Sequence, residues 1–147
     1  LRAVTLNDRE RIMTRTSGRS AFAVALYTLF EPVPLSFFVA AWIFDIIYLN
    51  SYVVEWTHAA SWLIAIGLVI AILPRLIALI DLFRGSRRAE KVHFWLTLVA
   101  ILLAIVNAFV HSRDAYAVVP SGVILSTLVV ALMLIANVQL ALRQRTA

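Results

Sequence analysis

The sequence contains no cysteine, and only 4 of its 147 residues are glycine and 4 are proline. Without cysteine, the chain forms no disulfide, no thiolate metal site and no cysteine nucleophile. So few glycines and prolines also exclude a low-complexity or disordered chain. Charge is scarce as well, because Asp, Glu, Lys and Arg make up 14% of the residues, whereas ordinary soluble domains have about 25%.

Apolar residues make up 63% of the chain, and most of them fall in four long stretches. The stretches are residues 33–49, 59–83, 92–110 and 118–142. Each has about the 17–25 residues that a helix needs to cross a hydrocarbon core of roughly 30 Å. The sequence therefore predicts an all-α integral membrane protein, with residues 33–142 forming a four-transmembrane-helix bundle.

A shorter apolar segment precedes the first stretch. Residues 1–20 read as a basic cytoplasmic arm, and residues 21–30 are apolar but too few to cross a membrane. Pro32 and Pro34 follow, and proline suits the first turn of a helix, where its missing N–H costs no hydrogen bond. We predict that residues 21–32 form a short interfacial helix or re-entrant segment. The alternative is one continuous, kinked helix over residues 21–49.

The basic residues outside the stretches lie almost wholly on one side of the predicted bundle. Residues 1–20, 84–91 and 143–147 together hold 11 Lys and Arg, whereas the other two connections hold only Arg113. The positive-inside rule then places both termini in the cytoplasm, with residues 143–147 as a cytoplasmic tail. The formal net charge of +5 indicates anionic lipid head groups as the partner rather than nucleic acid, because the cations flank membrane spans.

The connections between the stretches are short, so consecutive helices are expected to pack antiparallel. No connection is long enough to form a catalytic domain outside the membrane, and no HExxH or GxSxG motif is present. The sequence therefore favours a protein that is not itself an enzyme, and any chemistry must occur inside the bundle or on a partner.

Polar side chains inside predicted spans are costly and usually meet a partner or line a cavity. From the helical rise, Asp45 lies roughly 18 Å, Arg75 about 13 Å and Asn107 about 22 Å from the cytoplasmic ends of their helices. We predict an ion pair between Asp45 and Arg75, with Asn107 nearby. This cluster could be a clamp that fixes helix register, or a proton relay or substrate site. In a third reading, Arg75 extends alone toward the cytoplasmic face.

The sequence contains three histidines, and two histidines on facing helices can bind a haem iron. His93 and His111 share one helix face, but they are ~27 Å apart along the axis and cannot bind one iron. His58 and His111 both lie at the outer boundary, so they form the one plausible bis-histidine pair for haem b. The alternative is that both are interfacial residues in contact with water or head groups. His93 is expected to pack against, or bond to, the preceding loop.

The spacing of several polar residues resembles an uncharacterised bacterial family of small four-span inner-membrane proteins. In that family an HPxxVHFP-like motif opens the first span, and an Asp follows its last proline by eleven residues, as Asp45 follows Pro34 here. A family Asp ends the second span, matching Asp81. A His opens the third span with an Asn fourteen residues later, matching His93 and Asn107. The similarity extends from about residue 27 to residue 142.

The chain departs from this family at its two amino-terminal histidines, which correspond to Tyr27 and Pro32. If those histidines bind a cofactor in relatives, this chain cannot bind it in the same way. Members of the family are often encoded beside periplasmic quinoprotein dehydrogenases. The resemblance therefore implies an inner-membrane protein with an anchoring or electron-passing role, by association only.

Three functions follow as hypotheses. The first is a non-catalytic inner-membrane subunit that anchors or stabilises a larger complex, respiratory or related to a periplasmic dehydrogenase, with the other subunits as partners and no cofactor of its own. The second is an electron-transfer subunit that holds haem or quinone. The third is a small transporter or channel that uses Asp45 and Arg75, although transport sites usually show several polar groups or broken helices.

Overall fold

A computed structural model describes residues 20–113 and 118–145, and every regular element in these ranges is a helix. The helices are α2 (Ala21–Phe30), α3 (Val33–Ser51), α4 (Val54–Phe83), α5 (Arg88–His111) and α6 (Ser121–Arg145). Four segments are long and apolar enough to cross a membrane, the first being Ala21–Ser51 taken through its bend. The predicted all-α, four-span fold is confirmed.

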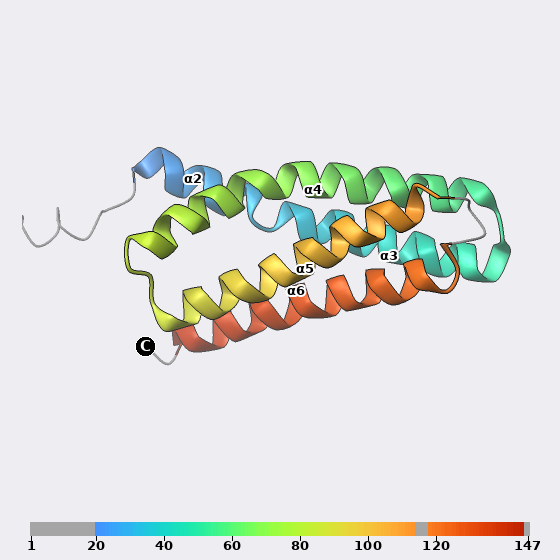
Figure 1. Ribbon diagram of the computed structural model, residues 1–147. Helices are drawn as coiled ribbons and strands as arrows, with labels where there is room; N and C mark the ends of the chain where they lie inside the picture. The colour runs from blue at the N-terminus through green and yellow to red at the C-terminus, as the bar shows by residue number, and fades with distance from the viewer. Residues whose placement is uncertain (1–19, 114–117, 146–147) are drawn as a thin grey trace, which may run out of the picture.

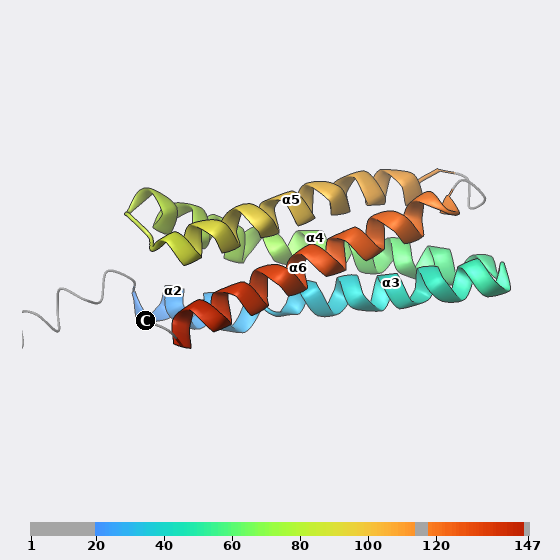
Figure 2. The ribbon, with the colours of Figure 1, turned by 90° about the horizontal axis from the view of Figure 1, so that it is seen from below.

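The four long helices form one elongated bundle of antiparallel neighbours (Figures 1 and 2). The described parts of the chain begin and end at the same end of this bundle, where α2 lies beside α4. Residues 52 and 53 alone separate α3 from α4, and residues 84–87 separate α4 from α5. Because these connections are so short, consecutive helices must pack antiparallel to each other.

Each long helix buries one narrow stripe whose residues recur at alternating intervals of three and four. On α3 the stripe includes Pro34, Phe38, Ala41, Asp45 and Tyr48. The other stripes are Thr57, Ala60, Ile64, Gly67, Ala71 and Pro74 on α4, His93, Thr97, Ala100, Ala104, Asn107 and His111 on α5, and Gly122, Ser126, Val129, Met133 and Ala136 on α6. This is the spacing of a left-handed coiled coil, and small side chains in the stripes let the helices approach closely.

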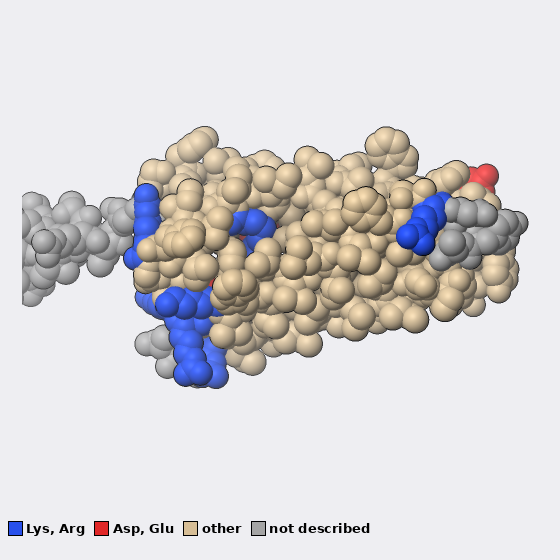
Figure 3. All heavy atoms as spheres, viewed as in Figure 1, with Lys and Arg blue, Asp and Glu red and all other residues tan. Residues whose placement is uncertain are grey.

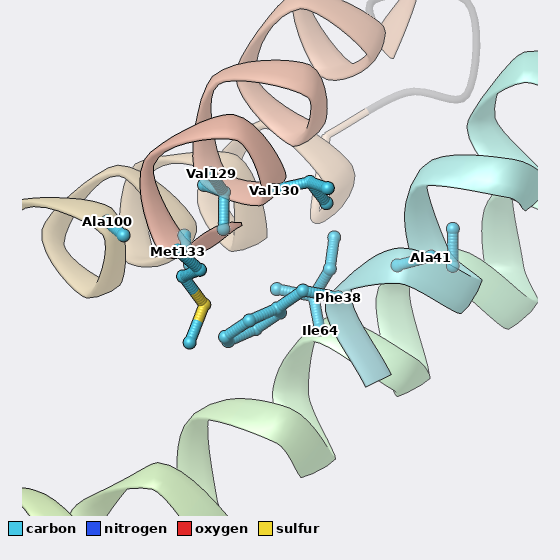
Figure 4. Close-up of a cluster of buried hydrophobic side chains, with 9 residues drawn as sticks. Phe38, Ala41, Ile64, Ala100, Val129, Val130 and Met133 are labelled. Atoms are coloured by element: carbon cyan, nitrogen blue, oxygen red, sulfur yellow. The ribbon is translucent and has the colours of Figure 1, made fainter. Parts of the chain in front are cut away.

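The middle of the bundle is filled by apolar side chains from all four helices (Figure 4). We call this cluster the apolar septum; its buried members are Phe38, Ala41, Ala60, Ile64, Ala100, Ala104, Val129, Val130 and Met133. Phe38 and Ile64 point toward Met133 across the bundle (Figure 4). The septum separates the polar residues of the stripes into two groups, one toward each end.

The break between α2 and α3 falls at the expected prolines. Glu31 and Pro32 form a bend, yet both keep right-handed helical dihedrals, and the Glu31 N–H still donates to the Tyr27 carbonyl oxygen over 2.9 Å. The path of the chain therefore lies between the two predicted alternatives: two helices, joined by a bend rather than by a loop. Whether α2 lies at the membrane surface stays a prediction.

Helix α4 is the longest, and it continues through Pro74, although proline removes the hydrogen bond to the carbonyl of residue 70. Over its last turns α4 bends away from its earlier direction (Figure 1). Since Arg75 bonds to Glu31, just before α3 begins, the eight residues 76–83 extend past the start of α3. This shift between α3 and α4 decides which polar side chains meet.

The charges of the bundle are sorted by end (Figure 3). We call one end the basic end, because it carries Arg84, Arg87, Arg88, Lys91, Arg143 and Arg145, and the opposite end the far end. Arg113 and the exposed Glu55 lie at the far end. The one-sided charge read from the sequence therefore becomes a property of the folded bundle.

Gly122 lies where α6 packs closely against His111 and Val118. A Cβ placed on this residue would lie 2.5 Å from Val118 Cγ1 and 3.0 Å from His111 Cε1. Cβ atoms in proteins essentially never lie closer than 3.0 Å to such a neighbour, so a larger residue here would force Val118 or α6 to shift.

We expect Gly122→Ala to lower the free energy of unfolding in detergent by about 1–3 kcal/mol, because the added methyl group overpacks the contact with Val118 and His111. Thermal or SDS denaturation followed by circular dichroism measures this. A variant more stable than the parent by about 1 kcal/mol, the gain in helix propensity alone, would contradict the close packing.

Candidate functional site: two buried polar clusters

The far-end cluster consists of Asp45, Asn107, His111 and Ser126. His111 Nε2 lies 2.7 Å from Asp45 Oδ1, and both side chains are fully buried. The Ser126 hydroxyl donates to Asp45 Oδ2, and the Asn107 amide donates to Ser126 Oγ over 2.7 Å. His111 Nδ1 lies 3.0 Å from the Asn107 carbonyl oxygen. The four residues thus close a ring of hydrogen bonds that joins α3, α5 and α6.

The basic-end cluster consists of Glu31, Arg75, His93 and Thr97. Arg75 Nη2 donates to Glu31 Oε1 over 3.2 Å, and Arg75 Nη1 donates to Thr97 Oγ1. His93 Nε2 lies 2.9 Å from the same Glu31 oxygen, while His93 Nδ1 lies 3.2 Å from the Ala136 carbonyl oxygen. Glu31 therefore ties the start of α3 to α4 and α5, and His93 continues the link to α6.

The two clusters repeat one arrangement. In each, a histidine of α5 directs Nε2 to a carboxylate beside or on α3, and directs Nδ1 to a backbone carbonyl. His93 and His111 are separated by eighteen residues, or about 27 Å of helix. The apolar septum fills the space between them.

The predicted ion pair between Asp45 and Arg75 is wrong. Asp45 bonds to His111 and Ser126, whereas Arg75 bonds to Glu31 and Thr97. Glu31 and Asp45 are fourteen residues apart, which is about 21 Å along a helix, and an arginine side chain cannot cover that distance. The depth estimate failed because it aligned the ends of α3 and α4, while α4 extends well past the start of α3.

The remaining predicted site residues lie as follows. Asn107 is near Asp45 as expected, linked to it through Ser126. His58 is exposed on α4, and both ring nitrogens of His111 face oxygen acceptors within the far-end cluster. Neither nitrogen of His111 is thus directed toward His58 for a shared iron, and the described residues contain no group of three His, Cys, Asp or Glu that could hold a metal.

Sequence reasoning did not place Glu31, Thr97 or Ser126 in a site. A signal for the α5 members was present: His93, Thr97, Asn107 and His111 recur on the three–four spacing of one helix face. Polar residues that share a stripe with alanines face the bundle interior, where each needs a hydrogen-bond partner.

A lipid-facing groove borders the basic-end cluster. It has a volume of about 660 Å³ and is lined by α4 from Leu68 to Phe83 and by α5 from Phe94 to Ile101. Its lining is apolar apart from Arg75. The two helices diverge toward the basic end (Figure 1), and the groove occupies this divergence.

Residues 24–140 match a protein family described as "Predicted membrane protein (DUF2231)". No curated protein and no solved structure matches the chain. The match covers all four spans almost completely, and it confirms the resemblance to an uncharacterised family of small membrane proteins.

A double-mutant cycle distinguishes the observed pair from the one first expected. Asp45→Asn and His111→Gln should each lower the free energy of unfolding by about 3 kcal/mol, because each leaves a buried group without its partner. Their effects should be non-additive by at least about 1 kcal/mol, whereas Asp45→Asn and Arg75→Leu should add within ~0.5 kcal/mol. Denaturation in detergent provides all of these values.

The matched control is Glu55→Gln, which removes an exposed carboxylate at the same end of the bundle and should change stability by less than ~0.5 kcal/mol. Coupling between Asp45 and Arg75, together with additivity between Asp45 and His111, would overturn the assignment.

Proposed function

The chain belongs to the DUF2231 family of predicted membrane proteins, and from this premise we propose that it is a non-catalytic subunit that anchors or stabilises a larger membrane complex. In this proposal the two polar clusters hold the bundle rigid, and the lipid-facing groove between α4 and α5 receives a transmembrane helix of a partner subunit.

The first support is the way in which the bundle uses its polar side chains. Asp45 bonds to His111, and Glu31 bonds to Arg75 and to His93. These polar groups therefore satisfy one another between helices instead of lining an open channel through the bundle. The space that Asn107 and Ser126 share with the septum has no volume for a water molecule. A closed septum gives a permeating solute no continuous polar path, which disfavours the transporter or channel hypothesis.

The groove supplies the second support, because its shape suits a helix better than a small ligand. Along α4 it extends over fifteen residue steps, or roughly 22 Å, which is most of a ~30 Å hydrocarbon core. Ile72, Leu76 and Trp95 are each more than half exposed there, and they provide ridges against which another helix can pack.

Arg75 adds a polar contact to this apolar surface. A guanidinium group has five N–H donors, and the described partners of Arg75 are two, Thr97 and Glu31. The others can donate to a carbonyl or a carboxylate on the occupying helix, where the low dielectric strengthens such bonds. This single cation favours a partner helix with an acceptor at the matching depth.

The location of the complex is part of the proposal. With the positive-inside rule, the basic end lies in the cytoplasm of a bacterial inner membrane, in contact with anionic head groups. The larger complex is then a respiratory or periplasmic-dehydrogenase assembly, as the resemblance implies. A quinone in the groove is the alternative occupant, and it would make the protein an electron-transfer subunit.

Photocrosslinking in native membranes tests the docking surface. We expect p-benzoylphenylalanine at Leu79 or Trp95, in the groove, to give a covalent adduct with a different protein. The same group at Ile135 should give none. Ile135 is 57% exposed on α6 and lies level with His93, which bonds to Ala136, but the apolar hollow of about 430 Å³ around it is lined by α6 alone and so offers no groove between two helices. Mass spectrometry identifies the adducts.

Each other outcome of this experiment overturns the docking proposal in a recognisable way. Adducts with quinone or lipid alone would support a small-molecule site in the groove. Adducts with a second copy of the chain would indicate a homodimer. Equal protein adducts from Leu79 and Ile135 would show that the groove is not a selective surface.

Reporter fusions test the orientation. We expect alkaline phosphatase inserted after Ser112 to be active, because it folds only outside the cytoplasm, and a green fluorescent protein fused after Ala147 to be fluorescent. The reciprocal fusions, phosphatase after Ala147 and fluorescent protein after Ser112, serve as controls and should be silent. The reverse pattern would place the basic end outside.

A further inference from the structure

We propose that Glu31 and His93 form a proton-binding site that exchanges its proton through a small cavity at the basic end, whereas the similar Asp45–His111 pair at the far end does not exchange its proton with water. The proposal rests on hydrogen-bond directions and on the cavity, and it does not depend on the anchoring function.

The hydrogen bonds of His93 require one more proton than a neutral histidine beside a carboxylate provides. Both ring nitrogens face oxygen acceptors: Nδ1 the Ala136 carbonyl at 3.2 Å, and Nε2 the Glu31 carboxylate at 2.9 Å. A neutral imidazole has a single N–H, so beside an ionised Glu31 one nitrogen lone pair would face an oxygen lone pair. The contacts are satisfied only by an imidazolium with a carboxylate, or by a neutral imidazole with a carboxylic acid.

The same reasoning applies to His111, whose nitrogens face the Asn107 carbonyl oxygen and Asp45 Oδ1. Here the added proton makes the buried pair neutral overall. Neutrality is what a fully buried site favours, since an uncompensated charge away from water is costly. Loss of the proton would leave a net negative charge in this buried site, so the far-end pair is expected to stay protonated.

At the basic end the balance of charge is different, because Arg75 also donates to Glu31. With the proton bound, the cluster carries one net positive charge, and without it the cluster is neutral. The cost of the positive charge is reduced by the acids that line the adjoining cavity, Asp81 of α4 and Glu90 of α5. Tyr27 of α2, Ser86 of the connection before α5 and Gln144 of α6 complete the titratable and polar groups that line this space. The free energies of the protonated and the deprotonated cluster therefore differ less at the basic end than at the far end.

The cavity provides the route. It has a volume of about 100 Å³, it lies between α2, α4, α5 and α6, and His93 forms part of its wall. At about 30 Å³ for each water in the liquid, this volume holds roughly three molecules. A proton from this water can enter between His93 Nε2 and Glu31 Oε1 with no other bond changed. The far-end pair has no such access, since the side chains of Asp45 and His111 are fully buried.

Nitrogen-15 NMR of histidine-labelled protein in lipid nanodiscs tests the proposal, because the ring shifts distinguish neutral from charged imidazole. Between pH 5 and pH 9, about the range that surrounds the ordinary histidine value, we expect His93 to change reversibly between the two signatures. The His111 signals should not change over this range. Single His→Asn variants assign the signals.

Two results would overturn the proposal. A His93 signal that stays neutral throughout, or one that stays charged throughout, would each show that this pair does not exchange its proton. Titration of His111 together with His93 would show that the far-end pair is not sealed.

Substitutions at the site and in the cavity separate the pair from its access route. With Glu31→Gln, His93 should show the neutral signature over the whole range, since Arg75 then stands beside it without a counter-charge. Ala78→Leu fills the cavity from α4 and should slow the exchange of the His93 ring proton with water at least tenfold. Ala141→Leu, an equal enlargement at an exposed position of α6, should leave the rate unchanged.

The His111 signals serve as the folding control: they should be the same in each variant as in the parent protein. Equal exchange rates in Ala78→Leu and Ala141→Leu would show that the cavity is not the route. If crosslinking finds no partner while His93 changes its protonation state, the anchoring proposal fails and the proton site stands. If crosslinking finds a partner while His93 does not change, the proton site fails and the anchoring proposal stands.

Discussion

The buried contact between Asp45 and His111 is the constraint on which the rest of the bundle depends. A carboxylate with no exposed surface is tolerated in a membrane helix only if its neighbours satisfy it, and here His111 and Ser126 do so. Because the three side chains come from α3, α5 and α6, satisfying Asp45 sets the height and the rotation of all three helices together. Apolar packing alone specifies register less strictly, since one leucine-sized side chain can replace another at little cost.

With the far end fixed in this way, the stripes of small residues bring the helices together and the remaining polar groups meet at the basic end. Glu31 then lies level with Arg75 and His93, and the apolar septum closes the space between the clusters. The bundle is thus held by polar contacts at two heights and by apolar packing between them. Such an arrangement favours rigidity over passage of a solute, and it leaves the groove along α4 and α5 as an unfilled apolar surface between two helices.

The elements of this fold were predictable and their alignment was not. The length and apolarity of each stretch predicted the four long helices, and the prolines at 32 and 34 predicted the break before α3. Asp45, Arg75 and Asn107 were recognised as polar residues inside the spans, but Asp45 was assigned the wrong partner. Counting residues from the apparent ends of two helices assumes that those ends are level, and α4 exceeds α3 by eleven residues. An error of a few turns is enough to exchange one partner for another.

By itself, the sequence determined that the chain spans a membrane four times, that its cations gather at one end, and that several polar side chains must face the bundle interior. These properties follow from local composition, because apolar residues partition into hydrocarbon and charged residues into water wherever they occur in the chain. Only the tertiary structure decided that Asp45 meets His111, that Glu31 joins Arg75 to His93, and that a small cavity reaches His93. These contacts join residues from 44 to 81 positions apart in the chain, and they depend on the relative height of helices, which no single stretch of sequence encodes.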